Sequence, residues 1–187
     1  MVNIEEYKQT IKQFAENKTN YRFQTLGKDY ALVIIERMFL NAKSSIKYTT
    51  KNLFDSDVEK NMSFIEALCF FLASPQSKLS ILVEELPENI SDKNPFNPYY
   101  RLYQHPAYKQ GRIKIGNSKG GHFMNNGKQI QFCVADSKMY RIETDIDKCL
   151  ASCNFYDNNM SANLENAFET AFSTIKSFVE LDKIFEE

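Results

Sequence analysis

The stretch Gln-Ile-Gln-Phe-Cys-Val-Ala-Asp, residues 129–136, is followed by Ser-Lys and then by Met-Tyr-Arg-Ile-Glu, residues 139–143. Both pieces contain the β-branched and aromatic residues that strands prefer, and Asp-Ser-Lys between them is typical of a turn. The stretch therefore predicts a β-hairpin with strands at residues 129–136 and 139–144. Further on, the chain reads Ala-Ser-Cys-Asn at residues 151–154.

This hairpin sequence resembles a motif of the phospholipase D superfamily. The motif is His, any residue, Lys, four residues and Asp at the end of a core strand, followed by Gly-Ser-x-Asn. If Asp136 is the Asp of the motif, Gln129 occupies the His position and Gln131 the Lys position. Residues 151–154 match the second signature in three of its four places, with Ala in place of Gly. The alternative is an ordinary hairpin in an unrelated α/β protein.

A closer likeness is to divergent, inactive phospholipase D-like proteins. These carry a His-Phe-x-Val-x-Asp strand and then a Tyr-Arg-x-Glu strand, and residues 131–136 and 140–143 fill those places, with Gln131 for the His. As an order of elements the resemblance covers roughly residues 29–180. It implies an α/β fold of the phospholipase D-like lobe type, in which helices flank a mixed β-sheet.

The residues at the motif positions cannot perform the chemistry of the family. Gln129 lacks the ring nitrogen that would form a phospho-enzyme intermediate, and Gln131 lacks the positive charge that would stabilise the transition state. We therefore expect a catalytically inactive protein that acts as a binding or regulatory module. The resemblance implies a bacterial operon, such as a phage-defence locus, as its setting.

The alternative function is that of a divergent phosphodiesterase or nuclease with a non-standard site. In that case His122, in a Gly-rich loop, would act together with Arg141, Glu143 and Asp136. Arg141 and Glu143 alternate on one strand, so both side chains lie on the same face. They could hold a phosphate group or form a salt bridge on the exposed face of the sheet.

Three further residues are candidates for a polar role. Ser152 and Asn154 could donate hydrogen bonds to a phosphate oxygen, or they could cap the turn into the last helix. Asp136 supports the catalytic pair in the family, but an Asp before Ser-Lys is also what a turn favours. Because the His that it would orient is missing, we favour a structural role for Asp136.

The balance of charge limits the partners of the chain. Its 187 residues include 23 basic and 24 acidic side chains, which gives a net charge of -1. This total gives no electrostatic footprint for nucleic acid, although scattered lysines near Tyr48 and Phe54 leave a weak nucleic-acid surface open. The apolar runs fall short of the ~18 residues that a membrane span needs, and the acidic N-terminus does not resemble a secretory signal. We expect a cytoplasmic protein with no membrane span.

The cysteines do not indicate a metal site or a cofactor. Cys149 and Cys153 could form a zinc site only together with His105 and His122, the two histidines of the chain. We favour free structural thiols, and we expect neither a metal nor a cofactor.

Periodicity predicts the remaining elements of a single domain, residues 1–187, with an N-terminal helical arm over residues 1–27 and a core over residues 28–187. Ser56 and Glu59 have the spacing of a capping box before a helix that ends at Ala73. The other predicted helices are residues 3–17, 28–43, 97–110 with a break near Pro106, and 158–185. The other predicted strands are residues 45–50, 78–84 and 112–116, and residues 117–128 are predicted to be a loop.

The resemblance also implies association, because single lobes of the family pair across the face that carries the motif strands. Gln129 and Gln131 are neutral there and tolerate burial better than an unpaired charge does. We therefore expect a homodimer or a stable complex with a protein partner through this face. A group of tyrosines could add interface area, or could instead pack inward: Tyr99, Tyr100, Tyr103 and Tyr108.

Overall fold

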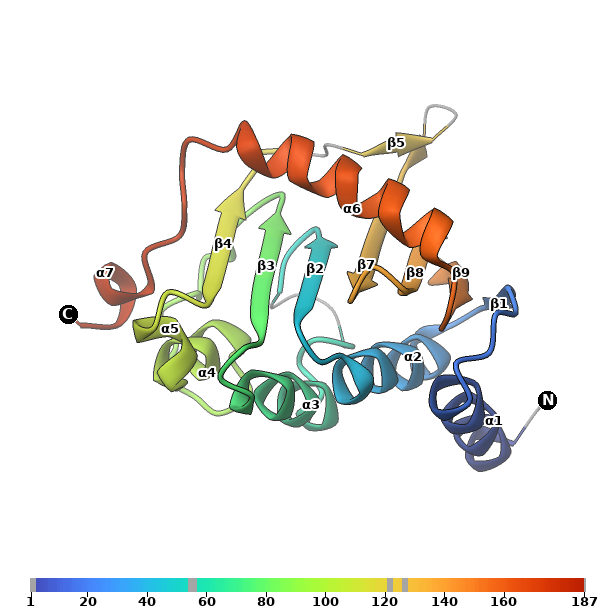
Figure 1. Cartoon of the computed structure of the whole chain (residues 1–187). Helices are drawn as coiled ribbons and strands as arrows, with labels where there is room; N and C mark the ends of the chain where they lie inside the picture. The colour runs from blue at the N-terminus through green and yellow to red at the C-terminus, as the bar shows by residue number, and fades with distance from the viewer. Residues whose placement is uncertain (1–2, 54–56, 121–122, 126–127, 187) are drawn as a thin grey trace.

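The computed structural model describes residues 3–53, 57–120, 123–125 and 128–186, and it shows a β-sheet between two layers of helices (Figure 1). The helices are α1 (Ile4–Glu16), α2 (Lys28–Asn41), α3 (Met62–Ala73), α4 (Pro98–Gln104), α5 (Pro106–Lys109), α6 (Asn158–Ser173) and α7 (Leu181–Phe185). The strands are β1 (Phe23–Thr25), β2 (Ser45–Thr50), β3 (Lys78–Val83), β4 (Ile113–Asn117), β5 (Met124–Asn125), β6 (Lys128–Gln129), β7 (Gln131–Ala135), β8 (Met139–Asp145) and β9 (Leu150–Asn154).

The main sheet is mixed, as the sequence predicts. Its seven strands lie in the order β1-β9-β8-β7-β2-β3-β4, so the motif strand β7 is the central one. Strands β2, β3 and β4 are parallel to one another, whereas β7 pairs antiparallel with both β2 and β8. The α/β fold class and the central place of the motif strand are therefore confirmed.

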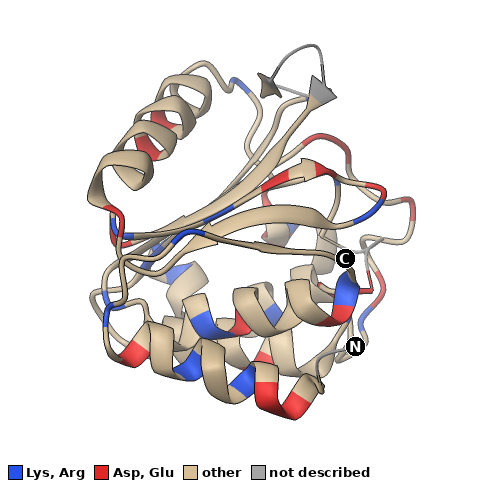
Figure 2. Ribbon diagram, turned by 90° about the vertical axis from the view of Figure 1, so that its right-hand side faces the viewer, with Lys and Arg blue, Asp and Glu red and all other residues tan. Residues whose placement is uncertain are grey.

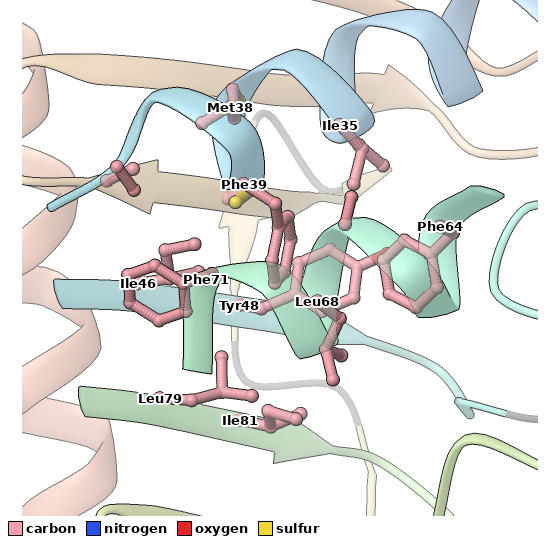
Figure 3. Packing of buried hydrophobic residues seen from close by; sticks show 14 of the residues in the cluster. Ile35, Met38, Phe39, Ile46, Tyr48, Phe64, Leu68, Phe71, Leu79 and Ile81 are labelled. Carbon is pink, nitrogen blue, oxygen red and sulfur yellow. The ribbon is translucent and has the colours of Figure 1, made fainter. Parts of the chain in front are cut away.

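The two faces of this sheet are covered unequally. Helices α1 to α5 line one face and α6 crosses the other, which Figure 2 shows from the side. Because strand residues alternate between faces, β7 sends Cys133 and Ala135 into the larger core and Phe132 and Val134 into the smaller core under α6. Figure 3 shows part of the larger core, where Phe39 of α2 packs edge-on against Phe64 and Phe71 of α3.

The helix after β2 begins later than the capping-box spacing predicts. Asn61 is the N-cap of α3, and its side-chain oxygen accepts a hydrogen bond from the Ser63 N–H at 3.0 Å. Glu59 is buried instead, so it does not cap a helix from the surface. Ser56 lies outside the described residues.

The last helix is also shorter than predicted, because α6 ends at Ser173. The apolar residues that extend its helical period beyond this point pack elsewhere: the segment at Phe178 runs antiparallel to β4. The Val179 N–H donates to the Ile115 carbonyl at 2.8 Å, and the Asn117 N–H donates to the Ser177 carbonyl at 3.1 Å. The segment thus covers the outer edge of β4.

The break near Pro106 is confirmed, since α4 and α5 meet there. Their tyrosines follow the inward alternative. Tyr99 is fully buried, and the rings of Tyr100 and Tyr103 each lie 5.3 Å from that of Phe185 in α7. Tyr99 is therefore part of the core, and Tyr100, Tyr103 and Tyr108 are partly buried against it.

Two smaller differences concern the motif region. The predicted strand over residues 129–136 is interrupted, because Gln129 belongs to β6, which pairs with β5 in a separate two-stranded sheet. The predicted loop over residues 117–128 contains β5. Among the residues described, no helix combines the length and the apolar character needed to cross a lipid bilayer.

Candidate ligand-binding site

The start of β7 brings Gln131 next to the two charged residues of β8. Gln131 pairs with Glu143 in the β7–β8 register, and Cys133 pairs with Arg141. Residues that are opposite each other in an antiparallel pair share a face. Gln131, Arg141 and Glu143 therefore all project from the sheet toward α2.

Arg141 and Glu143 form an ion pair inside the protein. Nη2 of Arg141 lies 2.8 Å from Oε1 of Glu143, and the two side chains are only 5% and 10% exposed. The salt bridge is thus present, but it lies on the covered face of the sheet and not on the exposed face. Burial alone would lower the pKa of Arg141, but the adjacent Glu143 carboxylate outweighs burial and raises this pKa.

A second carboxylate, Glu59, lies near this pair. Its Oε1 accepts hydrogen bonds from the hydroxyl groups of Tyr48 and Thr50, both on β2. Burial, together with the Glu59 carboxylate, raises the pKa of Tyr48 well above its ordinary value. Tyr48 is therefore a permanent hydrogen-bond donor to Glu59 at physiological pH.

These side chains surround a cavity of about 210 Å³ between α2 and the sheet. In the described part of the chain, three buried polar atoms of its lining have no hydrogen-bond partner: Arg141 Nε, Gln131 Nε2 and Glu59 Oε2. Leaving a buried polar atom unsatisfied costs ~1–3 kcal/mol, so three of them in one cavity need an explanation. The full lining is Ala31, Ile35, Tyr48, Thr49, Thr50, Lys51, Asn52, Val58, Glu59, Gln131, Phe132, Arg141, Glu143, Ile146 and Cys149.

The two candidates on β9 lie on the other side of the sheet. Ser152 pairs with Ile142 and Asn154 with Tyr140, so both face away from Arg141 and Glu143. The Ser152 hydroxyl accepts a 2.7 Å hydrogen bond from Nε of Arg22, and the Asn154 amide donates to Asn20 at 2.9 Å. The Asn154 side-chain oxygen also accepts a 2.9 Å hydrogen bond from the Tyr156 N–H, so Asn154 caps the turn that leads into α6, whose own N-cap is Asp157.

Asp136 lies at the opposite end of β7 from Gln131. Its carboxylate accepts hydrogen bonds of 2.7–2.9 Å from the backbone N–H groups of Lys43, Ser44 and Ser45 and from the Ser44 hydroxyl. Burial alone would raise the pKa of Asp136, but these hydrogen bonds together lower it. Asp136 thus ties the β7–β8 turn to the start of β2.

The residues of the alternative enzyme do not form one group. Arg141 and Glu143 line the cavity, whereas Asp136 is bound to Lys43, Ser44 and Ser45 at the start of β2. His122 lies outside the described residues. Gln129 donates a hydrogen bond to Glu84, the residue that follows β3.

Two of the lysines on and after β2 are paired with glutamates. Lys47 is bound by Glu165 and Glu169 of α6, and Lys51 pairs with Glu85 at 3.2 Å. The four cysteines are free thiols, and burial raises the pKa of Cys133 and of Cys153 to about 12. Within the described ranges, no three His, Cys, Asp or Glu side chains group together in a way that could hold a metal ion.

The sequence analysis missed Tyr48 and Glu59 as parts of this site. Tyr48 and Thr50 alternate on β2, and this alternation could have placed both hydroxyl groups on the face toward α2. The position of Glu59 depends on the path of the chain after β2, for which the sequence gives no periodic signal.

No protein-family profile matches the chain, and no curated protein sequence matches it. Solved structures are similar in fold. NucT from Helicobacter pylori aligns with a TM-score of 0.56 and 12% identity over 84% of this chain and 98% of that one. Nuc from Salmonella typhimurium, a phospholipase D family member, aligns with a TM-score of 0.53 and 9% identity over 83% of this chain and 97% of that one.

A third similar structure is TrmBL2, described as an archaeal chromatin protein with a novel mode of DNA binding. It aligns with a TM-score of 0.55 and 12% identity over 92% of this chain. The present chain spans only 60% of its length. The order of the elements, the mixed sheet with the motif strand at its centre and these alignments lead to one conclusion: the chain has a phospholipase D-like fold.

Proposed function

We propose that the protein is a catalytically inactive phospholipase D-like lobe that works as a binding module. The observation that carries this proposal is the state of the two motif positions. Gln129 is bound to Glu84, and Gln131 lies buried beside the Arg141–Glu143 pair. Neither amide can act as a nucleophile or supply a fixed positive charge.

The same region offers a place to bind. The cavity beside Gln131 has buried polar atoms without partners, which is typical of a site that is completed by another molecule. In this proposal the cavity serves recognition, while the chemistry of the fold has been lost.

The test is a search for turnover. Purified protein is incubated with single- and double-stranded DNA, with RNA and with phosphatidylcholine vesicles, and an active phosphodiesterase serves as positive control. We expect no cleavage above the level of heat-denatured protein. Steady turnover by the wild-type protein that disappears in a folded Glu143→Gln variant would show that the proposal is wrong.

Nucleic-acid binding is described for TrmBL2, and we do not extend it to the cavity of this chain. The net charge of -1 and the pairing of Lys47 and Lys51 with glutamates support this choice. A separate binding measurement tests this choice. Fluorescence anisotropy with labelled duplex DNA is expected to show no binding at 150 mM salt.

A further inference from the structure

The cavity between α2 and the sheet has two unlike sides. Its polar groups come from the sheet and from the chain just after β2: Gln131, Arg141, Glu143, Tyr48 and Glu59. Its apolar wall includes Ala31 and Ile35 of α2. A molecule that fills the cavity therefore meets hydrogen-bonding groups along one edge and hydrocarbon elsewhere.

We propose that this cavity binds an uncharged, planar nitrogen heterocycle of nucleobase size. The proposal rests on the binding role proposed above and names the ligand class of the same site. At about 210 Å³ the cavity is smaller than the ~300–1,000 Å³ typical of sites for drug-sized ligands, so its occupant is a small molecule.

The unsatisfied atoms define the hydrogen bonds that the ligand makes. Arg141 Nε and Gln131 Nε2 are donors without a partner in the described structure, and Glu59 Oε2 is an acceptor without one. All three side chains belong to residues that are at least nine-tenths buried. The ligand must therefore accept and donate hydrogen bonds, as the edge of a nucleobase does.

The charges at the site disfavour an anion. One guanidinium group faces two carboxylates, and Glu143 already neutralises Arg141 at 2.8 Å. The ammonium group of Lys51, at the rim, is paired with Glu85. A phosphate or carboxylate would have to lie beside Glu59 without a free cation, which is unfavourable in a buried site.

The apolar wall disfavours a sugar. A hexose carries hydroxyl groups around its whole ring, and those facing Ala31, Ile35 and Val58 would find no partner. A heterocycle has apolar faces and confines its polar atoms to its edge. Flipped bases in enzymes are held in this way, by hydrogen bonds to the edge and apolar contacts to the faces.

The test measures binding of adenine, hypoxanthine, cytosine and uracil to the full chain by isothermal titration calorimetry and saturation-transfer NMR. Glucose and inorganic phosphate are the comparison ligands. We expect at least one base to bind more tightly than glucose and phosphate. Backbone amide shifts of the wild-type protein should then change in α2 and at the start of β7, and not in α6.

Two variants test the hydrogen bonds. Gln131→Met keeps the length of the side chain and removes its donor, and Glu59→Gln keeps an oxygen for Tyr48 while replacing the free acceptor by a donor. Each should weaken binding by ~10-fold or more, since one hydrogen bond in a buried site has about this effect. Ser152→Ala, on the opposite face of the same sheet, is the matched control and should bind within ~2-fold of wild type.

Each outcome decides the question. If no base binds at millimolar concentration, if phosphate or glucose binds more tightly than every base, or if the shifts map outside the cavity, the proposal is overturned. The titration of the wild-type protein and its backbone amide shift changes test the proposal even if a variant does not fold. Absence of turnover together with absence of base binding would refute this inference alone, whereas nuclease or phospholipase activity would refute the proposed function.

Discussion

Arg141 and Glu143 are two charges from one strand that are both taken out of water, and each depends on the other. Removing one partner of a buried ion pair leaves the other charge unpaired, which costs ~3–5 kcal/mol. We expect Arg141→Met to lower the free energy of unfolding by about 3 kcal/mol, because Glu143 stays buried. Urea denaturation monitored by circular dichroism measures this change.

The double variant Arg141→Met with Glu143→Leu is the control for this prediction. Replacing a whole buried pair by apolar residues of similar volume is often neutral. The double variant should therefore recover most of the stability that the single variant loses. A single variant as stable as the wild type would mean that water reaches the pair.

Asp136 makes a pH-dependent contribution to stability. Its pKa is lowered in the folded protein, while an unfolded Asp titrates near ~3.9. The Asp136 contribution is therefore fully present above pH ~4 and is lost as the pH falls through the lower folded value. The difference in unfolding free energy between wild type and Asp136→Asn should stay constant from pH 7 to pH 5 and shrink below pH 4. A difference that grows toward low pH would contradict this assignment.

The sequence predicts part of the site at this scale. Alternation along β8 correctly places Arg141 and Glu143 on one face of the sheet. Ser152 and Asn154 lie on the opposite face, but this follows only once the register of β8 and β9 is known. The sequence does not reveal which face is buried, because that depends on the packing of α2 over the sheet. Because the packing of α2 cannot be read from the sequence, the Arg141–Glu143 salt bridge is expected on the surface but lies inside the protein.

The elements follow their local sequence signals where those signals are strong. The long apolar period gives α2, and Pro106 separates α4 from α5. These sequence signals give the wrong element where one apolar pattern is compatible with both a helix and an extended segment. The apolar residues beyond Ser173 continue a helical period, yet the backbone there bonds to β4 because an open edge strand offers N–H and C=O groups.

The start of α3 is a place where two capping signals compete. The observed N-cap is Asn61, and an N-cap residue is worth ~1 kcal/mol relative to Ala. Asn61→Ala should therefore lower the free energy of unfolding by about 1 kcal/mol. Asn61→Asp, which retains an acceptor for the Ser63 N–H, should leave it nearly unchanged. Equal losses in both variants would mean that Asn61 acts through some contact other than the cap.

At the scale of the molecule, the two edges of the sheet differ. The segment around Phe178 covers β4 at one edge. At the other edge β1 pairs only with β9 among the residues described, and Tyr21 and Leu26, which flank β1, are each 58% exposed. Of the two motif positions in the expected interface, Gln131 is buried beneath α2, whereas Gln129 is half-buried. The β1 edge is therefore a second surface at which we expect a partner to bind.

We therefore expect self-association through β1. An edge strand with unpaired backbone groups and apolar neighbours is a template for pairing with a second copy. Size-exclusion chromatography with light scattering at ~100 µM should show a dimer, and Leu26→Lys should shift it toward monomer, because a lysine at an edge disfavours pairing. Phe70→Lys, on the exposed face of α3 at 62% exposure, is the matched control and should leave the dimer intact. A wild-type protein that stays monomeric at this concentration, or a dimer that Phe70→Lys disrupts and Leu26→Lys does not, would exclude the β1 edge as the interface.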